Sequence, residues 1–211
     1  MTASRTARAA AFLLADAVFG ACSGNSTEPR TARPETTQLP EPSLEPTSPR
    51  AEPTARKSQR GNVTKEIGEI AFNYDPARGP DVRWLEFKIT DLEVDGDCTD
   101  PQAEPENGHL LFVTITASTA TEWPPDVINA GVTAVSFNPS DFAIVGADDL
   151  AERDLSTDAT RSCLSETELL PLRIGPGEKV EGKVVLDTAN PSGILVFRPV
   201  YAGGSGWEWE Y

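Results

Sequence analysis

Histidine and cysteine are scarce in this chain, which limits the chemistry it can carry. His109 is the only histidine, so a Ser-His-Asp triad would depend on it, and no G-x-S-x-G motif accompanies it. The three cysteines form no C-x-x-C pair and no Cys/His cluster, which argues against a zinc site. We therefore expect no enzyme, no cofactor and no bound metal, with His109 a bystander at a strand start.

Basic residues are scarce in the C-terminal part of the chain. Residues 63–211 contain 10 Lys+Arg and 27 Asp+Glu, a net charge of −17. So strong a negative charge excludes nucleic acid and anionic lipid headgroups as ligands of this part. It favours solubility and, where recognition is concerned, a cationic partner or a loosely held divalent ion.

Long apolar runs are absent as well. The longest, Ala9–Ala21, spans 13 residues, whereas a membrane-spanning helix needs about 20. Arg5 and Arg8 precede the run and small residues end it, which is the order of a secretory signal peptide over residues 1–21. Asp16 interrupts the run at a cost of roughly 3 kcal/mol on insertion scales, which predicts inefficient export.

The end of this signal, Phe19-Gly20-Ala21-Cys22, resembles the lipobox of bacterial lipoproteins, although Phe19 replaces the usual Leu. The resemblance implies that Cys22 receives a diacylglycerol and becomes the first mature residue. It places the protein on the outer face of the cytoplasmic membrane, held there through the lipid on Cys22. The alternatives are plain secretion after cleavage near Ala21 and a cytosolic protein.

The remaining two cysteines are an even pair once Cys22 is acylated. An oxidising compartment then favours a disulfide between Cys98 and Cys163. Two separate buried thiols are the alternative.

Residues 22–62 have the composition of a disordered tether behind the lipidated cysteine. Seven prolines and many Ser and Thr accompany only two large apolar residues, Leu39 and Leu44. A coil of this length spans roughly 35 Å, enough to lift a following domain away from a membrane surface.

Residues 63–211 are expected to form one domain, because apolar and polar residues alternate there with the period of β-strands. In Leu111–Thr116, three aliphatic residues alternate with Phe112 and two threonines, so that strand should be covered on both faces. A short helix or turn is expected at Ser165–Leu170, where Ser165 and Glu168 could form a cap. The expected strands include Leu85–Ile89, Leu111–Thr116, Val180–Leu186, Ile194–Phe197 and Trp207–Tyr211. Frequent turn signals between them indicate an all-β fold, an antiparallel β-sandwich.

Four segments form a recognisable pattern in this order: Ile67–Glu69, Leu110–Ala117, Phe137–Asp148 and Leu172–Leu186. This pattern resembles the telokin-like, immunoglobulin-fold domains of unknown function found in Gram-positive lipoproteins and secreted antigens. The resemblance implies an immunoglobulin-like sandwich outside the cytoplasm and supplies no catalytic residues. Ala117, Ser118 and Asp149 depart from the pattern of that family.

Two acidic loops are the candidate contact regions: residues 95–108 and residues 148–160. Loops at one end of a sandwich commonly carry recognition, and a third long loop, 121–134, could join them. Neither acidic loop has the ligand spacing of a calcium-binding EF-hand, so solvated loops are the simpler interpretation. The acids concerned are Asp95, Asp97 and Asp100 in the first loop, and Asp148, Asp149, Glu152, Asp154 and Asp158 in the second.

Trp207 and Trp209 at the C-terminus could present a sugar-stacking face, but their alternation favours burial in the core. Together these features predict a lipid-anchored extracytoplasmic binding or interaction domain, whose partner is an extracytoplasmic protein or a cationic molecule. A structural or antigen-like envelope component without a specific ligand is the alternative, and a carbohydrate or calcium binder is a third hypothesis.

Overall fold

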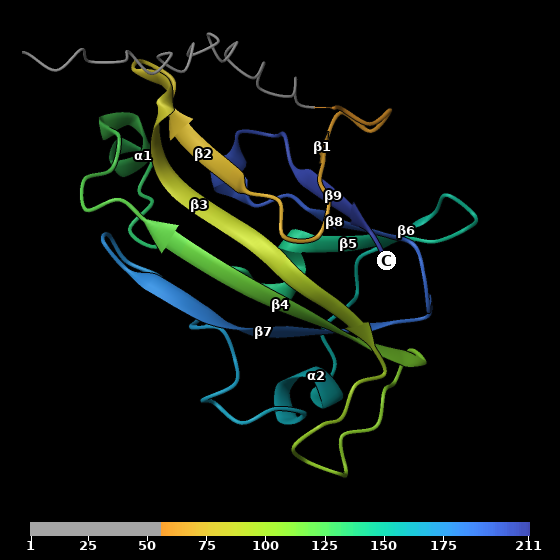
Figure 1. Ribbon diagram of the computed structural model, residues 1–211. Helices are drawn as coiled ribbons and strands as arrows, with labels where there is room; N and C mark the ends of the chain where they lie inside the picture. Colours follow the sequence, from red (N-terminus) through yellow and green to blue (C-terminus); the bar gives the residue numbers. More distant parts are fainter. Residues whose placement is uncertain (1–55) are drawn as a thin grey trace, which may run out of the picture. The chain divides into compact units, whose positions relative to one another are not determined.

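The computed structural model describes residues 56–211 (Figure 1). The predicted signal peptide, Cys22 and the predicted tether up to residue 55 lie outside the described residues. The strands are β1 (Val63–Thr64), β2 (Ala71–Asp75), β3 (Gly79–Val94), β4 (His109–Thr119), β5 (Phe142–Val145), β6 (Ala151–Glu152), β7 (Lys179–Thr188), β8 (Ile194–Phe197) and β9 (Trp207–Glu210). The helical elements are the short helices α1 (Pro125–Asn129) and α2 (Asp158–Ser162) and the 3-10 turns η1 (Pro139–Asp141) and η2 (Val200–Ala202).

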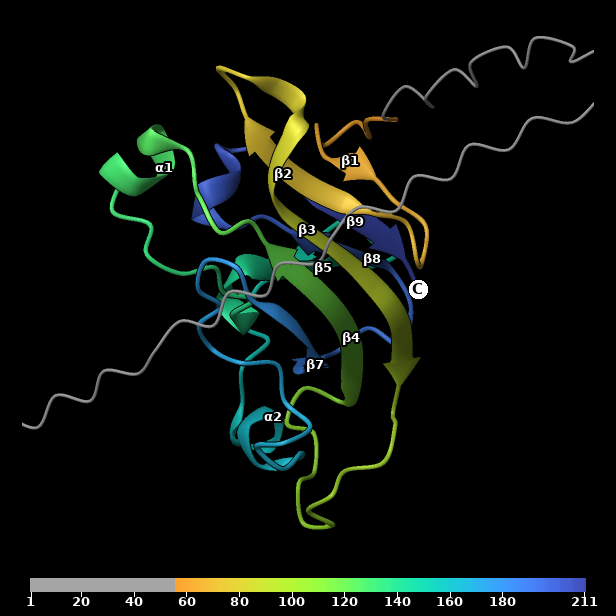
Figure 2. The same ribbon diagram turned by 60° about the vertical axis from the view of Figure 1, so that its left-hand side comes forward.

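The strands form two sheets that share one core (Figures 1 and 2). One sheet has five strands in the order β1-β9-β8-β5-β6, and the other has four in the order β2-β3-β4-β7. Neighbouring strands are antiparallel except β1 and β9, which are parallel. The two-sheet, mostly β architecture agrees with the fold class that the alternation predicts. No helix of the described residues is long and apolar enough to cross a membrane.

Aromatic side chains fill the centre of the core between the sheets. The Phe87 ring on β3 lies 5.0 Å from the Trp207 ring and 5.6 Å from the Phe197 ring, centroid to centroid, with edge-on geometry that aromatic pairs prefer. Trp207 and Trp209 are 6% and 1% exposed. The expectation that both tryptophans belong to the core is therefore confirmed, and neither is free to stack on a sugar.

Strand β4 is covered on both faces, as its sequence predicts. Leu111 and Val113 point into the shared core, whereas Phe112 points outward and is still only 1% exposed. Its cover comes from α2 and the residues after it, which bring Ala159 and Leu164 over this face. Burial on both faces explains why the usual alternation fails along this strand.

The segment Ser165–Leu170 forms a turn rather than a helix. The backbone N–H groups of Glu168 and Leu169 donate to the Ser165 carbonyl, and the Glu168 carboxylate accepts the Ser165 N–H at 3.0 Å. The helix of this region is instead α2, just before it. Five residues are too few to show a helical period in the sequence, so α2 escapes prediction.

Residues 56–62 fold onto the domain, although their composition assigns them to the tether. Asn62 is fully buried, and its side-chain amide donates to the Glu208 carboxylate on β9 at 3.1 Å. The Val63 N–H donates to the Gly206 carbonyl at 2.9 Å, which starts the parallel pairing of β1 with β9. The folded part therefore begins earlier than the expected boundary at residue 63.

Candidate functional site

The two acidic loops come together at one end of the molecule. Cys98 and Cys163 are joined by a disulfide, with their Cα atoms 4.6 Å apart, which ties the loop 95–108 to the end of α2. The Asn107 side chain also donates to the Asp154 carbonyl at 3.0 Å. The third loop, 121–134, carries α1 and follows the opposite end of β4 (Figure 1).

A buried carboxylate that sequence reasoning missed holds these loops in place. Asp187 on β7 has no exposed surface. Its oxygens accept the backbone N–H groups of Glu106 at 2.7 Å and Asn107 at 3.0 Å, and the Thr157 hydroxyl at 2.7 Å. Because three donors satisfy it, Asp187 is a structural residue and is not available to a ligand.

Two acids of the first loop, Asp95 and Asp100, form hydrogen bonds with groups in or next to the same loop. One Asp95 oxygen lies 2.7 Å from Nδ1 of His109, and the other accepts the Leu110 N–H at 3.1 Å. Asp100 accepts the Gln102 N–H at 3.0 Å, and Asp97 is exposed. His109 thus lies at the start of β4, as expected, and orients the loop through Asp95.

The acids of the second loop differ in how tightly the fold uses them. Glu152 on β6 accepts hydrogen bonds from the Thr188 hydroxyl, the Ala189 N–H and the Asn190 side chain, so it fixes the turn between β7 and β8. Asp148 caps a turn through the Leu150 N–H, and Asp158 pairs with Arg161 within α2. Asp149 and Asp154 are exposed.

No group of three or more His, Cys, Asp and Glu side chains within residues 56–211 is arranged to hold a metal ion. A contact between the exposed acids and a cationic partner stays a prediction.

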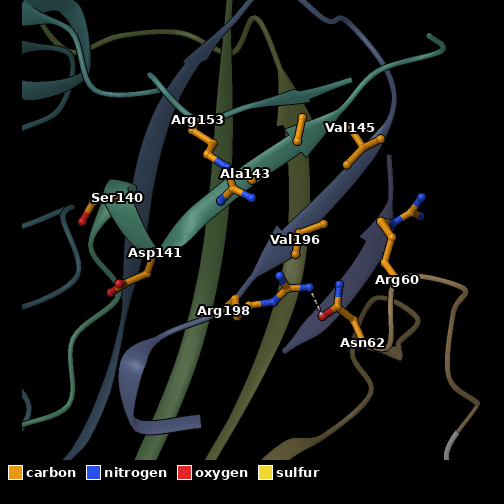
Figure 3. A pocket seen from close by; sticks show the side chains of 10 residues that line it. Arg60, Asn62, Ser140, Asp141, Ala143, Val145, Arg153, Val196 and Arg198 are labelled. Carbon is orange, nitrogen blue, oxygen red and sulfur yellow. Dashed lines mark hydrogen bonds between the residues drawn. The ribbon is translucent and has the colours of Figure 1, made fainter. Parts of the chain in front are cut away.

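A group of three cationic side chains lines a pocket elsewhere, on the outer face of the five-stranded sheet (Figure 3). We call this pocket, of about 310 Å³, the arginine pocket. Its arginines come from three separate segments: Arg60 precedes β1, Arg153 follows β6 and Arg198 follows β8. The lining residues are Arg60, Asn62, Ser140, Asp141, Ala143, Val145, Ala151, Arg153, Val196 and Arg198.

Small apolar side chains form the floor of the arginine pocket. Ala143 on β5 pairs with Val196 on β8, and Val145 lies two residues along β5. Because side chains alternate along a strand, these three point outward while Phe142 and Ile144 fill the core. They are nonetheless about 95% buried, at 5–6% exposure. Figure 3 shows the Arg153 side chain extending over β5 toward Ala143.

The three arginines differ in their partners. Arg60 pairs with Glu208 at 3.3 Å, so its charge is largely balanced. Arg198 donates to the Asn62 side-chain oxygen at 2.7 Å, which orients the guanidinium and leaves its charge uncompensated (Figure 3). Within residues 56–211, neither Arg153 nor Arg198 has an acidic partner within 4.0 Å.

This arrangement can bind an anion. A guanidinium group offers several N–H donors in a plane, a geometry that matches a carboxylate or a phosphate. The apolar floor removes water from one side of the bound group and strengthens such contacts. The pocket lining contains three arginines and one aspartate, whereas acids outnumber bases in residues 63–211 as a whole.

The sequence offers little that could have revealed this pocket. Arg60 and Asn62 fall in the segment assigned to the tether, and more than 100 residues separate Arg60 from Arg198. One weak signal exists: Arg153 and Arg198 each lie two residues after an outward-facing apolar residue, Ala151 and Val196. Their convergence becomes visible only when β6 and β8 are placed on either side of β5.

No protein-family model matches the chain, and no curated protein is a significant match to it. The resemblance to the telokin-like domains therefore has no support from a family model. Among solved structures, the chain is similar to YcdA of Bacillus subtilis, described as a "putative lipoprotein", with 12% sequence identity and a TM-score of 0.38. That match covers 61% of this chain and 36% of the other.

Proposed function

We propose that this chain is a lipid-anchored binding domain on the outer face of the cytoplasmic membrane, and that it holds a small anion in the arginine pocket. The observation that carries the proposal is the pair of guanidinium groups, Arg153 and Arg198, left without acidic partners beside an apolar floor. In a domain with so large an excess of acids, nearby carboxylates would be expected to pair with them. A binding role without catalysis also accords with the placement of His109, which contacts Asp95 outside the pocket.

The location rests on the sequence and the cysteines. Arg5, Arg8 and the apolar run before Phe19–Cys22 support export and lipidation. The Cys98–Cys163 disulfide accords with an oxidising compartment. An immunoglobulin-like topology for the two sheets is part of the same proposal, through the telokin-like resemblance.

Calorimetric titration of the full chain in detergent, with propionate and with inorganic phosphate as probes, tests the anion site. We expect Arg153→Gln and Arg198→Gln each to weaken binding about tenfold, close to the 1.5 kcal/mol lower bound for a hydrogen bond to a charged group. The matched control is Arg173→Gln, which removes an exposed arginine that bonds Thr133 outside the pocket. No binding of either anion, or an equal loss in the control, would contradict the proposal and favour an envelope component without a ligand.

Metabolic labelling with a clickable fatty acid tests the anchor. We expect label on the wild-type chain and none on Cys22→Ala, since the acylated sulfur is gone. Label that persists on the variant would exclude Cys22 as the lipidation site.

A further inference from the structure

The arginine pocket is not uniformly positive. Asp141, the last residue of η1, lies at one end of it, beside Ser140. The Arg198 N–H donates to the Asp141 carbonyl at 2.8 Å, so the two residues sit side by side at the ends of β8 and β5. Their side chains do not pair: within the described residues, the Asp141 carboxylate has no basic group within 4.0 Å. The pocket therefore presents an acceptor at one end and donors along the rest.

Asp141 is also partly buried. Burial raises the pKa of Asp141, and the backbone amide of Asn138 opposes this only in part. Its neighbour Tyr201 supplies no donor, because the Tyr201 hydroxyl already donates to the Ser136 carbonyl at 3.1 Å. Burial and the nearby Asp141 charge both raise the pKa of Tyr201, which keeps that hydroxyl neutral. A ligand with a positively charged donor would supply the charged partner that Asp141 lacks among the described residues.

The apolar floor of the arginine pocket limits which chemical groups of a ligand can lie between Asp141 and the guanidinium groups. Its side chains are Ala143, Val145, Ala151 and Val196, and no aromatic residue lines the pocket. A sugar ring therefore finds no stacking surface here. Small aliphatic groups fit such a floor, and a volume of about 310 Å³ is at the lower limit of ligand pockets, which start near 300 Å³.

Resting on the proposed anion site, we infer that the ligand is a zwitterion, namely an amino acid or short peptide with small aliphatic side chains. Its carboxylate lies between the guanidinium groups of Arg153 and Arg198. Its ammonium group meets Asp141, and its side chains cover Ala143, Val145 and Val196. Asn62 is the positioning residue that holds Arg198 toward the carboxylate.

The test compares four probes on the wild-type full chain by calorimetric titration: alanylalanine, its N-acetylated form, its C-terminal amide, and propionate. We expect alanylalanine to bind best, and either capped form to bind at least tenfold more weakly. In Asp141→Asn, the free and N-acetylated dipeptides should bind within twofold of each other, because the partner of the ammonium group is neutral. Asp81→Asn, which removes an exposed acid outside the pocket, should keep the wild-type ranking.

The ligand-side comparison needs no variant, so it holds even if Asp141→Asn fails to fold. Equal binding of the free and N-acetylated dipeptides to the wild-type chain would overturn the zwitterion while leaving the anion site intact. Binding of propionate or phosphate without any binding of alanylalanine would do the same. Failure of all four probes and of phosphate would instead overturn the anion site itself.

Discussion

The acidic loops and the arginine pocket hold opposite charges, and the fold uses those charges in opposite ways. Around the loops, Asp95, Glu152 and Asp187 accept hydrogen bonds from the chain's own N–H and hydroxyl groups. In the pocket, Arg153 and Arg198 lack acidic partners among the described residues. The abundant acids at the loops therefore help to hold the fold together, while two of the scarce arginines lack acidic partners and line the pocket that we propose as the anion site.

The largest expected effect comes from removing the disulfide that ties the two acidic loops together. The double change Cys98→Ser and Cys163→Ser should lower the free energy of unfolding by about 4 kcal/mol, because the disulfide closes a loop of 65 residues. Urea denaturation measures this loss. A reducing agent should reproduce it in the wild-type chain and leave the variant unchanged. Propionate affinity should not move, and a parallel loss of affinity would show that the two regions are coupled.

A somewhat smaller loss is expected from Asp187→Ala. Three part-buried hydrogen bonds lose their acceptor. Because Glu106 and Asn107 are exposed residues, each loss should be near the lower end of the usual range, about 1 kcal/mol, for a total of about 3 kcal/mol. Asp187→Asn is the matched control, since its amide keeps one acceptor oxygen and should lose less. Thermal and urea unfolding measure both. Equal stabilities for the two variants would contradict the assigned role of Asp187.

The smallest effect is expected from neutralising the exposed acids of the second loop, with Glu152 retained for its bonds. Changing Asp148, Asp149, Asp154 and Asp158 to Asn should alter stability by less than about 0.5 kcal/mol. Anion affinity should rise less than about threefold, and the gain should vanish in 1 M salt, where the screening length is about 3 Å. A calcium-dependent rise in melting temperature that only the wild-type chain shows would instead identify these acids as a cation site.

The sequence predicted most of the fold because burial of one sheet face leaves a period of two. Leu85–Ile89 and Ile194–Phe197 lie within β3 and β8, and the two-faced strand β4 was also found. The helix α2 escaped because it is short and packs through Ala159 against a strand that is distant in sequence. Local patterns report which face is buried, but not which distant element buries it.

The candidate site was predicted poorly, for a related physical reason. Asp95 and Asp158 were predicted as contact residues because acids cluster in the sequence of their loops. Such clustering does not show whether each carboxylate already accepts hydrogen bonds from the chain itself. Arg60 and Arg198 become neighbours only through the pairing of β1 with β9 and of β9 with β8. Of the predicted site residues, Cys98 and Cys163 form their bond, whereas Cys22 lies outside the described residues.

The parallel pairing of β1 with β9 has a mechanical consequence. Tension that pulls the N-terminal segment away from the domain loads the bond from the Val63 N–H to the Gly206 carbonyl and the contacts of Asn62. With two residues in β1, this is a short attachment, and it should yield before the core strands do. Because Arg60 and Asn62 form one wall of the arginine pocket, force on the N-terminal segment should open the pocket and release the anion that we propose binds there.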